Sequence, residues 1–212
     1  MIGWNFPTMP QFDAVLFDFD GVLADSEPLH YACWAEALAP LGVVLSWEFF
    51  RDRCVGLDDR EMMRLIAAQS GPPRDWETLW ARHPAKKELF GRRMLAAPPF
   101  APGVGPLLEE LRGAYKLAVV TSSARSEIEP ALAAGDLLEY FDALVCGREA
   151  ERLKPAPDPY LMAARLVGAK QPLVVEDSAY GIASGRAAGF DVLVIPSTDE
   201  MAALVRNRLE LP

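Results

Sequence analysis

Short, fully apolar runs recur along the chain and predict the strands of a buried parallel sheet. Such runs are typical of strands that helices cover on both faces. The side chains of such a strand are buried on both sides, so polar residues do not alternate with apolar ones. The runs with this character are rich in valine and leucine: AVLFD (14–18), LAVVT (117–121), ALVC (143–146), LVVED (173–177) and VLVIP (192–196). Helical patterns separate most of them, which predicts a doubly wound α/β core.

One connection between these runs is far longer than a crossover helix requires. It follows the first run and carries helical patterns at 26–42, 58–69 and 75–95. A proline-rich stretch at 96–105, typical of a linker, comes after them. We therefore expect a helical insertion that leaves the sheet and returns to it. The predicted core consists of residues 1–27 and 97–212, and the predicted α-helical cap of residues 28–96.

Composition and charge narrow the class of protein. The 212 residues are 51% hydrophobic and 24% charged, which is ordinary for a globular domain. The net charge of −9 argues against nucleic-acid binding, which needs a basic face, but allows a small anionic substrate in a local basic pocket. The sequence lacks a membrane-spanning stretch, a signal-peptide pattern and a disulfide framework. We expect a cytoplasmic enzyme or binding protein without a nucleic-acid or membrane partner.

Polar side chains follow several of the apolar runs at the point where each run ends. Ligands of open α/β sheets bind beyond the carboxyl ends of the strands, so these positions are candidates for a functional site. Three runs end in such residues and a lysine lies between the third and fourth run: Asp18 and Asp20, Thr121 with Ser122 and Ser123, Glu176 and Asp177, and Lys154.

Four carboxylates at one edge of a sheet cannot all remain ionised without a cation. A hard ion that prefers oxygen ligands is implied, and Mg²⁺ suits a site that also handles phosphate. With the metal present, a carboxylate can attack a phosphoryl group and form an aspartyl-phosphate. The lysine and hydroxyl groups would hold the transferring oxygens.

Four stretches resemble the motifs of the haloacid dehalogenase superfamily, in the order and at the kind of spacing found there: DFDGVLADSE, VVTSSA, LKPAPDPY and VVEDSAYGIASGRAAG. The helical insertion after the first motif resembles the cap of the β-phosphoglucomutase-like phosphatase branch. The resemblance covers nearly the whole chain after the first dozen residues. It implies a Rossmann-like core with a cap, and a Mg²⁺-dependent phosphatase of a small phosphorylated metabolite such as a sugar phosphate.

The resemblance also implies roles for the acidic residues. Asp18 matches the nucleophile, and Asp20 matches the general acid/base that protonates the leaving oxygen and then activates water. Asp18, the backbone carbonyl of Asp20 and Asp177 match the metal ligands. Glu176 matches a direct or supporting ligand.

The phosphate-holding residues follow from the same resemblance. Thr121 and Lys154 match the pair that holds the phosphate, helped by backbone N–H groups near Gly21 and Ser122. Gly21 permits the tight turn that brings the backbone close to the ligand. Ser123 is a further candidate beside Ser122.

The predicted cap contributes two candidate substrate contacts. His30 matches a histidine that helps position the acid/base residue in mutase-type members, and a histidine facing solvent or core is the alternative. Lys86 matches a cap lysine that reaches the substrate, against the alternative of a solvated helix face. Mutase-type members bind the far phosphate of a bisphosphate with a cap-loop arginine, whereas the matching stretch here offers Asp58 and Asp59.

Three functions fit these observations. The phosphatase is favoured because the acid at Asp20 is present. A β-phosphoglucomutase-type phosphomutase is weakened by the acids in the cap loop. A non-catalytic phosphate-ligand binding protein is disfavoured because Asp18, Asp20, Lys154 and Asp177 are all kept. The sequence names no substrate, and it is compatible with a monomer or a weak homo-oligomer.

Overall fold

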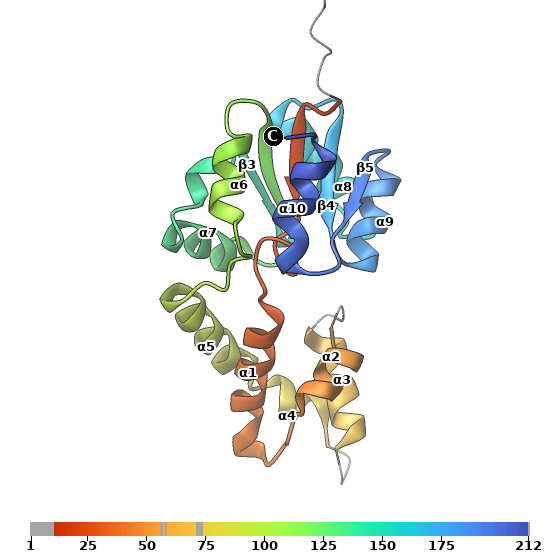
Figure 1. The fold of residues 1–212 in the computed structure, drawn as a ribbon. Helices are drawn as coiled ribbons and strands as arrows, with labels where there is room; N and C mark the ends of the chain where they lie inside the picture. The colour runs from red at the N-terminus through yellow and green to blue at the C-terminus, as the bar shows by residue number, and fades with distance from the viewer. Residues whose placement is uncertain (1–10, 56, 58, 71–73, 212) are drawn as a thin grey trace, which may run out of the picture.

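The core of the protein is a parallel sheet of five strands. The computed structural model describes residues 11–55, 57, 59–70 and 74–211. The strand order is β3-β2-β1-β4-β5 (Figure 1). The strands lie within one or two residues of the predicted runs: β1 (Ala14–Phe17), β2 (Lys116–Thr121), β3 (Ala143–Cys146), β4 (Pro172–Glu176) and β5 (Asp191–Val194).

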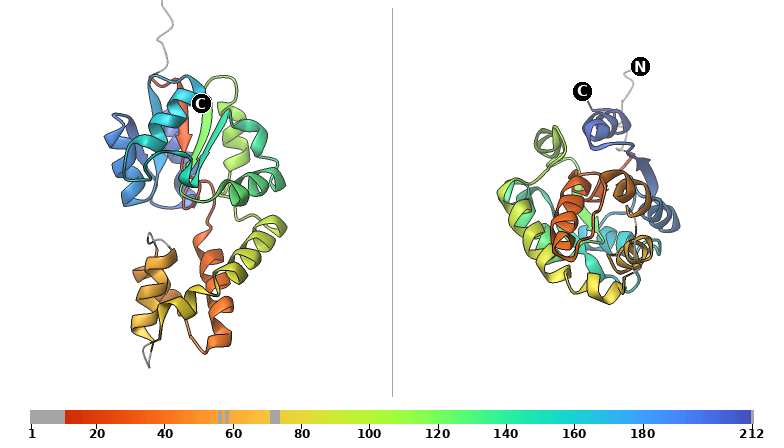
Figure 2. Two further views of the ribbon diagram at one scale, coloured as in Figure 1. Left: turned by 180° about the vertical axis from the view of Figure 1, so that it is seen from behind. Right: turned by 90° about the horizontal axis from the view of Figure 1, so that it is seen from below.

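Helices cover both faces of the sheet, so the doubly wound α/β prediction is confirmed (Figures 1 and 2). In β1, Val15 and Phe17 pack into a cluster with α6, α7 and α10, while Ala14 and Leu16 pack into a cluster with α8. Both faces of a strand must be apolar in this arrangement, which explains the unbroken apolar runs. The helices are α6 (Val104–Leu111), α7 (Arg125–Ala134), α8 (Asp158–Val167), α9 (Ala179–Ala187) and α10 (Thr198–Arg208).

A helical lobe lies beyond the carboxyl ends of the strands, below the sheet in Figure 1. It has a hydrophobic cluster of its own, built around Trp34, Leu38, Met63 and Leu79. Its helices are α1 (Glu27–Leu38), α2 (Trp47–Arg53), α3 (Asp59–Gln69), α4 (Trp76–Trp80) and α5 (His83–Ala96). The separate cluster supports the proposed division into a core and a cap, whose boundaries stay a prediction.

Prolines set the ends of the helices in this lobe. The pattern over 26–42 forms α1 and then a short 3₁₀ turn over Ala39–Leu41, because Pro40 has no N–H to continue the α-helical ladder. The pattern over 75–95 is split between α4 and α5, and Pro84 occupies the first turn of α5, where a missing N–H costs nothing.

The two chain segments that join the lobe to the core lie side by side. The Asp25 N–H donates to the Pro99 carbonyl (2.8 Å), and the Ala101 N–H donates to the Leu23 carbonyl (2.8 Å). A further contact joins α5 to α7, where Lys87 Nζ lies 3.1 Å from Glu127 Oε1. The lobe therefore meets the core directly beside the strand ends. Among the described residues, no helix has both the length and the apolar character that crossing a bilayer demands.

Candidate active site

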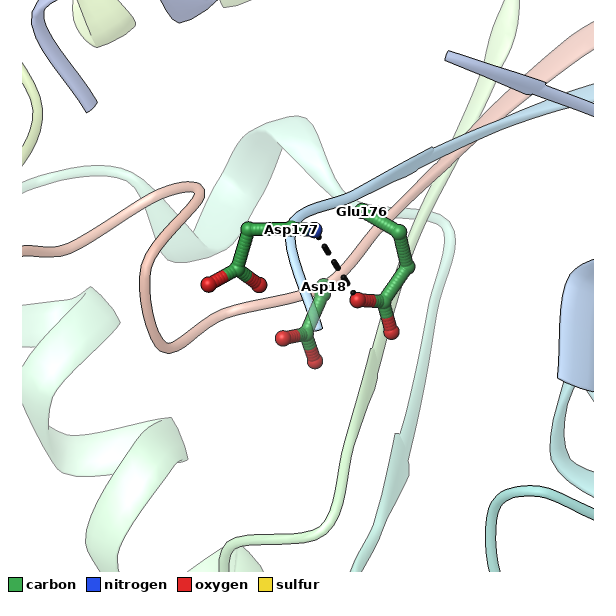
Figure 3. Close-up of side chains that lie close together, drawn as sticks. All are labelled: Asp18, Glu176 and Asp177. Atoms are coloured by element: carbon green, nitrogen blue, oxygen red, sulfur yellow. Dashed lines mark hydrogen bonds between the residues drawn. The ribbon is translucent and has the colours of Figure 1, made fainter. Parts of the chain in front are cut away.

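Three of the four acidic residues singled out in the sequence converge at the carboxyl ends of two adjacent strands (Figure 3). Asp18 directly follows β1, and its N–H donates to the Val175 carbonyl of β4 (2.9 Å), which extends the ladder. Glu176 is the last residue of β4, and Asp177 follows it. Carboxylate oxygens of these three acids lie within 4.8 Å of one another. The parallel register thus places together residues that are far apart in the sequence.

Lys154 lies buried between two of these carboxylates. Its Nζ is 2.8 Å from Asp18 Oδ1, 2.6 Å from Glu176 Oε1 and 2.9 Å from the Val120 carbonyl. Burial alone would lower the pKa of this ammonium, but the charges of Asp18 and Glu176 outweigh burial and raise the pKa. Burial also raises the pKa of Asp18, against the opposing charge of Lys154. An ammonium with three acceptors has no free N–H left, so its position is well defined.

Glu176 is fully buried and both of its oxygens are engaged. Oε1 accepts from Lys154 and from the Tyr160 hydroxyl (2.8 Å). Oε2 accepts from the Asp177 N–H (3.0 Å) and from both the N–H and the hydroxyl of Ser178 (3.1 and 3.0 Å). A β-carbon at Gly181 would collide with this carboxylate, which explains the glycine early in α9. In this arrangement Glu176 is a counter-ion for the lysine.

Asp177 is available to a cation in a way that Glu176 is not. Its Oδ1 is buried and has no hydrogen-bond partner among the described residues. Burial, with help from the charge of Glu176, raises the pKa of Asp177 to about 7. Ser178, not Asp177, caps α9, since its hydroxyl accepts from the Gly181 N–H (3.0 Å). A buried carboxylate oxygen without a hydrogen-bond partner, close to a second carboxylate on Asp18, is the kind of ligand that a hard cation prefers.

Asp20 lies among hydroxyl groups at the start of the connection to the helical lobe. Its Oδ1 accepts from Ser26, and its Oδ2 accepts from Ser123 (2.7 Å) and, more weakly, from Thr121 (3.5 Å). The Thr121 hydroxyl in turn accepts from the Ser123 N–H (3.0 Å). Ser122 is exposed in the same loop. These hydroxyls hold the Asp20 carboxylate toward the end of β2.

Sequence reasoning missed the contact between Ser26 and Asp20. Ser26 precedes α1 and has the residue type of a helix cap, yet its side chain makes no capping bond. The hydroxyl is fully buried and donates to Asp20 instead. A serine before a helix is so common that only the fold distinguishes this use of the side chain from capping.

His30 and Lys86 connect the helical lobe to Asp20. Lys86 Nζ lies 2.9 Å from His30 Nδ1, and His30 Nε2 lies 4.0 Å from Asp20 Oδ1. Burial, and then the charge of Lys86, lower the pKa of His30 to about 4, and its ring stacks on Phe90 at 4.1 Å. An ammonium can only donate, so Nδ1 of the neutral ring accepts and the ring proton resides on Nε2, facing Asp20.

Lys86 is only 3% exposed and has a counter-ion in the lobe. Asp59 Oδ2 lies 3.7 Å from Lys86 Nζ and 3.4 Å from His83 Nε2, and Asp59 Oδ1 accepts from the Trp34 indole (3.3 Å). Sequence reasoning gave His83 no role because nothing in the local pattern pairs it with Asp59. The neighbouring acid Asp58 lies outside the described residues.

The sequence model of haloacid dehalogenase-like hydrolases matches residues 15–195, which include all residues of the five strands except Ala14. The chain belongs to this family. The resemblance expected from the four motifs is therefore confirmed, and the chain is a hydrolase of the family's phosphatase type. Two curated relatives are similar to it over most of their length. They are the phosphorylated carbohydrates phosphatase of Thermotoga maritima (30% identical, 91% of this chain and 90% of the relative) and the fructose-1-phosphate phosphatase YqaB of Escherichia coli (29%, 86% and 96%).

Two solved structures are similar to this chain over most of its length. The crystal structure of CbbY from Rhodobacter sphaeroides in complex with phosphate is 30% identical, with a TM-score of 0.73 over 86% of this chain and 85% of that chain. A CbbY variant in complex with xylulose 1,5-bisphosphate is 27% identical, with a TM-score of 0.71 over the same shares of the chains. These likenesses confirm the α/β core with its helical region.

Proposed function

We propose that this hydrolase is a Mg²⁺-dependent phosphatase of a small phosphorylated metabolite, in particular a sugar monophosphate. One observation supports it above the others. Asp18 lies beside the Lys154 ammonium, while Asp20, two residues on, is surrounded by hydroxyl groups and faces the neutral His30. One carboxylate is thereby held for attack on phosphorus, and the other is placed near the helical lobe to handle protons. The names of the two curated phosphatases agree with this proposal.

The reaction needs two displacements at phosphorus. A carboxylate oxygen of Asp18 forms a bond to phosphorus while the bond from phosphorus to the ester oxygen breaks, and Asp20 gives its proton to that leaving oxygen. Asp20 then takes a proton from water, the water oxygen bonds to phosphorus, and the acyl phosphate bond breaks to free Asp18. Lys154 holds positive charge beside Asp18 throughout.

The metal has a place in this proposal that the side chains define. Asp18 and Asp177 are the carboxylates that would hold Mg²⁺, since both oxygens of Glu176 are already engaged. The bound ion would supply positive charge next to the transferring phosphoryl group. The backbone carbonyl of Asp20 remains a proposed third protein ligand.

The cluster of Lys86, His30, His83 and Asp59 in the helical lobe suits a monophosphate better than a bisphosphate. A second phosphate group would need an uncompensated cation, but Lys86 is buried and paired with Asp59. His30 and His83 both have a lowered pKa because burial disfavours the imidazolium, so neither adds positive charge at neutral pH. This polar cluster is close to neutral as a whole, which suits the hydroxyl groups of a sugar and weakens the phosphomutase alternative.

A matched panel of esters tests the proposed function. The purified chain is incubated with fructose 1-phosphate, fructose 1,6-bisphosphate, glucose 1-phosphate and phosphoglycolate, and released phosphate is measured with Mg²⁺ or with EDTA. We expect release from at least one sugar monophosphate, faster than from the matching bisphosphate. We expect EDTA to reduce it at least about 100-fold.

Other outcomes of the panel would contradict the proposal. Interconversion of glucose 1-phosphate and glucose 6-phosphate without net release would establish a phosphomutase. Binding of these esters without any turnover would establish a binding protein on the same fold. Full activity in EDTA would remove the metal from the proposal.

Replacing Gly21 by alanine tests how closely the backbone must approach Asp177. Gly21 has a φ of +77°, and a β-carbon there would collide with the Asp177 carboxylate. We expect Mg²⁺ affinity, measured by calorimetry, to fall at least about tenfold, because the displaced carboxylate no longer faces Asp18. Gly168→Ala is the matched control: its φ is +74° but its β-carbon would have no heavy atom within 4 Å. Equal affinities in the two variants would contradict the predicted role of the close approach.

A further inference from the structure

The Tyr160 hydroxyl is a buried polar group that the chemistry described above does not use. Tyr160 lies on α8, is fully buried, and its ring packs among Leu16, Ala118 and Val120 on one face of the sheet. A phenylalanine would fill this apolar space equally well and would bury no hydroxyl. The hydroxyl donates to Glu176 Oε1 at 2.8 Å. Its position therefore matters for Glu176 and not for packing alone.

The two carboxylate oxygens of Glu176 are held by different kinds of contact. Oε2 is held by backbone and side-chain donors of Asp177 and Ser178, which follow it directly in the chain. Among the residues that the structure describes, Oε1 is held by two side chains, Lys154 and Tyr160. Without the Tyr160 hydroxyl, the carboxylate plane could rotate about the fixed oxygen and follow the lysine. With it, Oε1 has one defined position.

That position decides where the Lys154 ammonium points. The three acceptors of Lys154 are Asp18, the Val120 carbonyl and Glu176 Oε1. The Val120 acceptor is a backbone carbonyl of β2, whereas the Asp18 and Glu176 acceptors are side-chain oxygens. Of these two, Glu176 Oε1 is the one that the Tyr160 hydroxyl also holds. The centroid of the Tyr160 ring also lies 5.1 Å from Lys154 Nζ, so the ring occupies that side of the ammonium.

We propose that Tyr160 is a positioning residue for phosphoryl transfer: its hydroxyl fixes Glu176 and, through Glu176, orients Lys154 on Asp18. The Tyr160 hydroxyl bonds to Glu176, so Tyr160 acts through another residue and not on the reacting atoms. The inference rests on the phosphatase activity proposed above. It predicts a loss in the chemical step that is separate from substrate binding, because Lys154 must be aligned when charge develops on the transferring group.

The Tyr160→Phe variant removes the hydroxyl and keeps the ring. We expect kcat to fall about tenfold while KM stays within about twofold, since a hydrogen bond to a charged group is lost but no substrate contact is. Tyr140→Phe is the matched control. It removes another tyrosine hydroxyl, whose pKa the nearby Glu109 carboxylate raises, beside the start of β3 and away from the site, and should leave kcat unchanged.

A double-mutant cycle separates a positioning role from a structural one. If Tyr160 acts through Glu176, Tyr160→Phe should reduce kcat less than about twofold once Glu176→Gln is present. Equal losses in both backgrounds would overturn the route through Glu176. A Tyr160→Phe enzyme with wild-type kcat would overturn the proposal itself. A wild-type chain that releases no phosphate from the whole panel would refute the proposed function instead, so the two failures are distinguishable.

Discussion

The Asp18→Asn variant should release phosphate from a sugar phosphate at least about 10⁴-fold more slowly than the wild type, because an amide oxygen is a poor nucleophile toward phosphorus. The structure gives this substitution a clean interpretation. Asparagine has the shape of aspartate, and its carbonyl oxygen can still accept the bond from Lys154 that Asp18 Oδ1 accepts now. The fold and the position of the lysine should therefore survive, while the step that forms the acyl phosphate is lost.

A matched control comes from the opposite end of the same strand. Asp13 precedes β1 and accepts from the Lys170 and Gln171 N–H groups (2.7 and 3.0 Å), away from the strand ends that carry the site. Asp13→Asn should lower the unfolding temperature by no more than a few degrees and keep kcat near the wild-type value. Rapid-quench measurements should detect labelled phosphate on the wild-type protein and none on Asp18→Asn. Burst labelling of Asp18→Asn at the wild-type amplitude would rule out Asp18 as the nucleophile.

The strands of the core could be predicted because burial on both faces leaves a pattern in the sequence of each strand. A strand covered on both faces has to be apolar at every position, so AVLF and LVV can be recognised without knowing their neighbours. The strand order was not available in this way. It depends on which runs pair across long connections, such as Ala14 with both Lys116 and Pro172. Pairing of that kind leaves no local pattern.

For the candidate site, the sequence likewise predicted which residues lie at one edge of the sheet but not how they contact one another. Residues that follow apolar runs could be assigned to one edge of the sheet, and the structure places Asp18, Thr121 and Glu176 there. The sequence could not show which hydrogen-bond partners each of these groups has. Glu176 and Asp177 are neighbours of the same charge, yet one is occupied by donors and the other keeps an unpaired oxygen. Part of that difference comes from the contacts of Glu176 Oε1 with Lys154 and Tyr160, which lie far from it in the sequence and which no spacing encodes.

The contacts among the cap residues could be predicted even less well from the sequence. His30 and Lys86 are 56 positions apart, and their contact depends on how α1 packs against α5. Asp59 was considered only as an acid in place of an arginine, whereas it also neutralises Lys86 and contacts His83. Charge balance within a cluster is a property of three helices together. It became visible only when their relative positions were known.

The Lys154→Met variant should lose about 3–5 kcal/mol of unfolding free energy in EDTA, in addition to at least about 10³-fold of kcat. The stability loss follows from burial. Lys154 is 6% exposed, and its removal leaves the carboxylates of Asp18 and Glu176 facing each other without the ammonium. Methionine has nearly the same length and adds no charge, so the change tests the cation and not the space it fills. Urea denaturation measures the difference.

Two further variants decide whether the buried cation is the cause. Lys87→Met breaks the exposed ion pair with Glu127 and should cost less than about 1 kcal/mol, because solvent screens that pair. Adding Glu176→Gln to Lys154→Met should recover part of the loss, since one of the two buried charges is then gone. Equal losses in the two lysine variants would mean that a proton on Asp18 or Glu176, and not the ammonium, neutralises the strand ends. In that case Asp18 would not be the ionised nucleophile that the proposed mechanism requires.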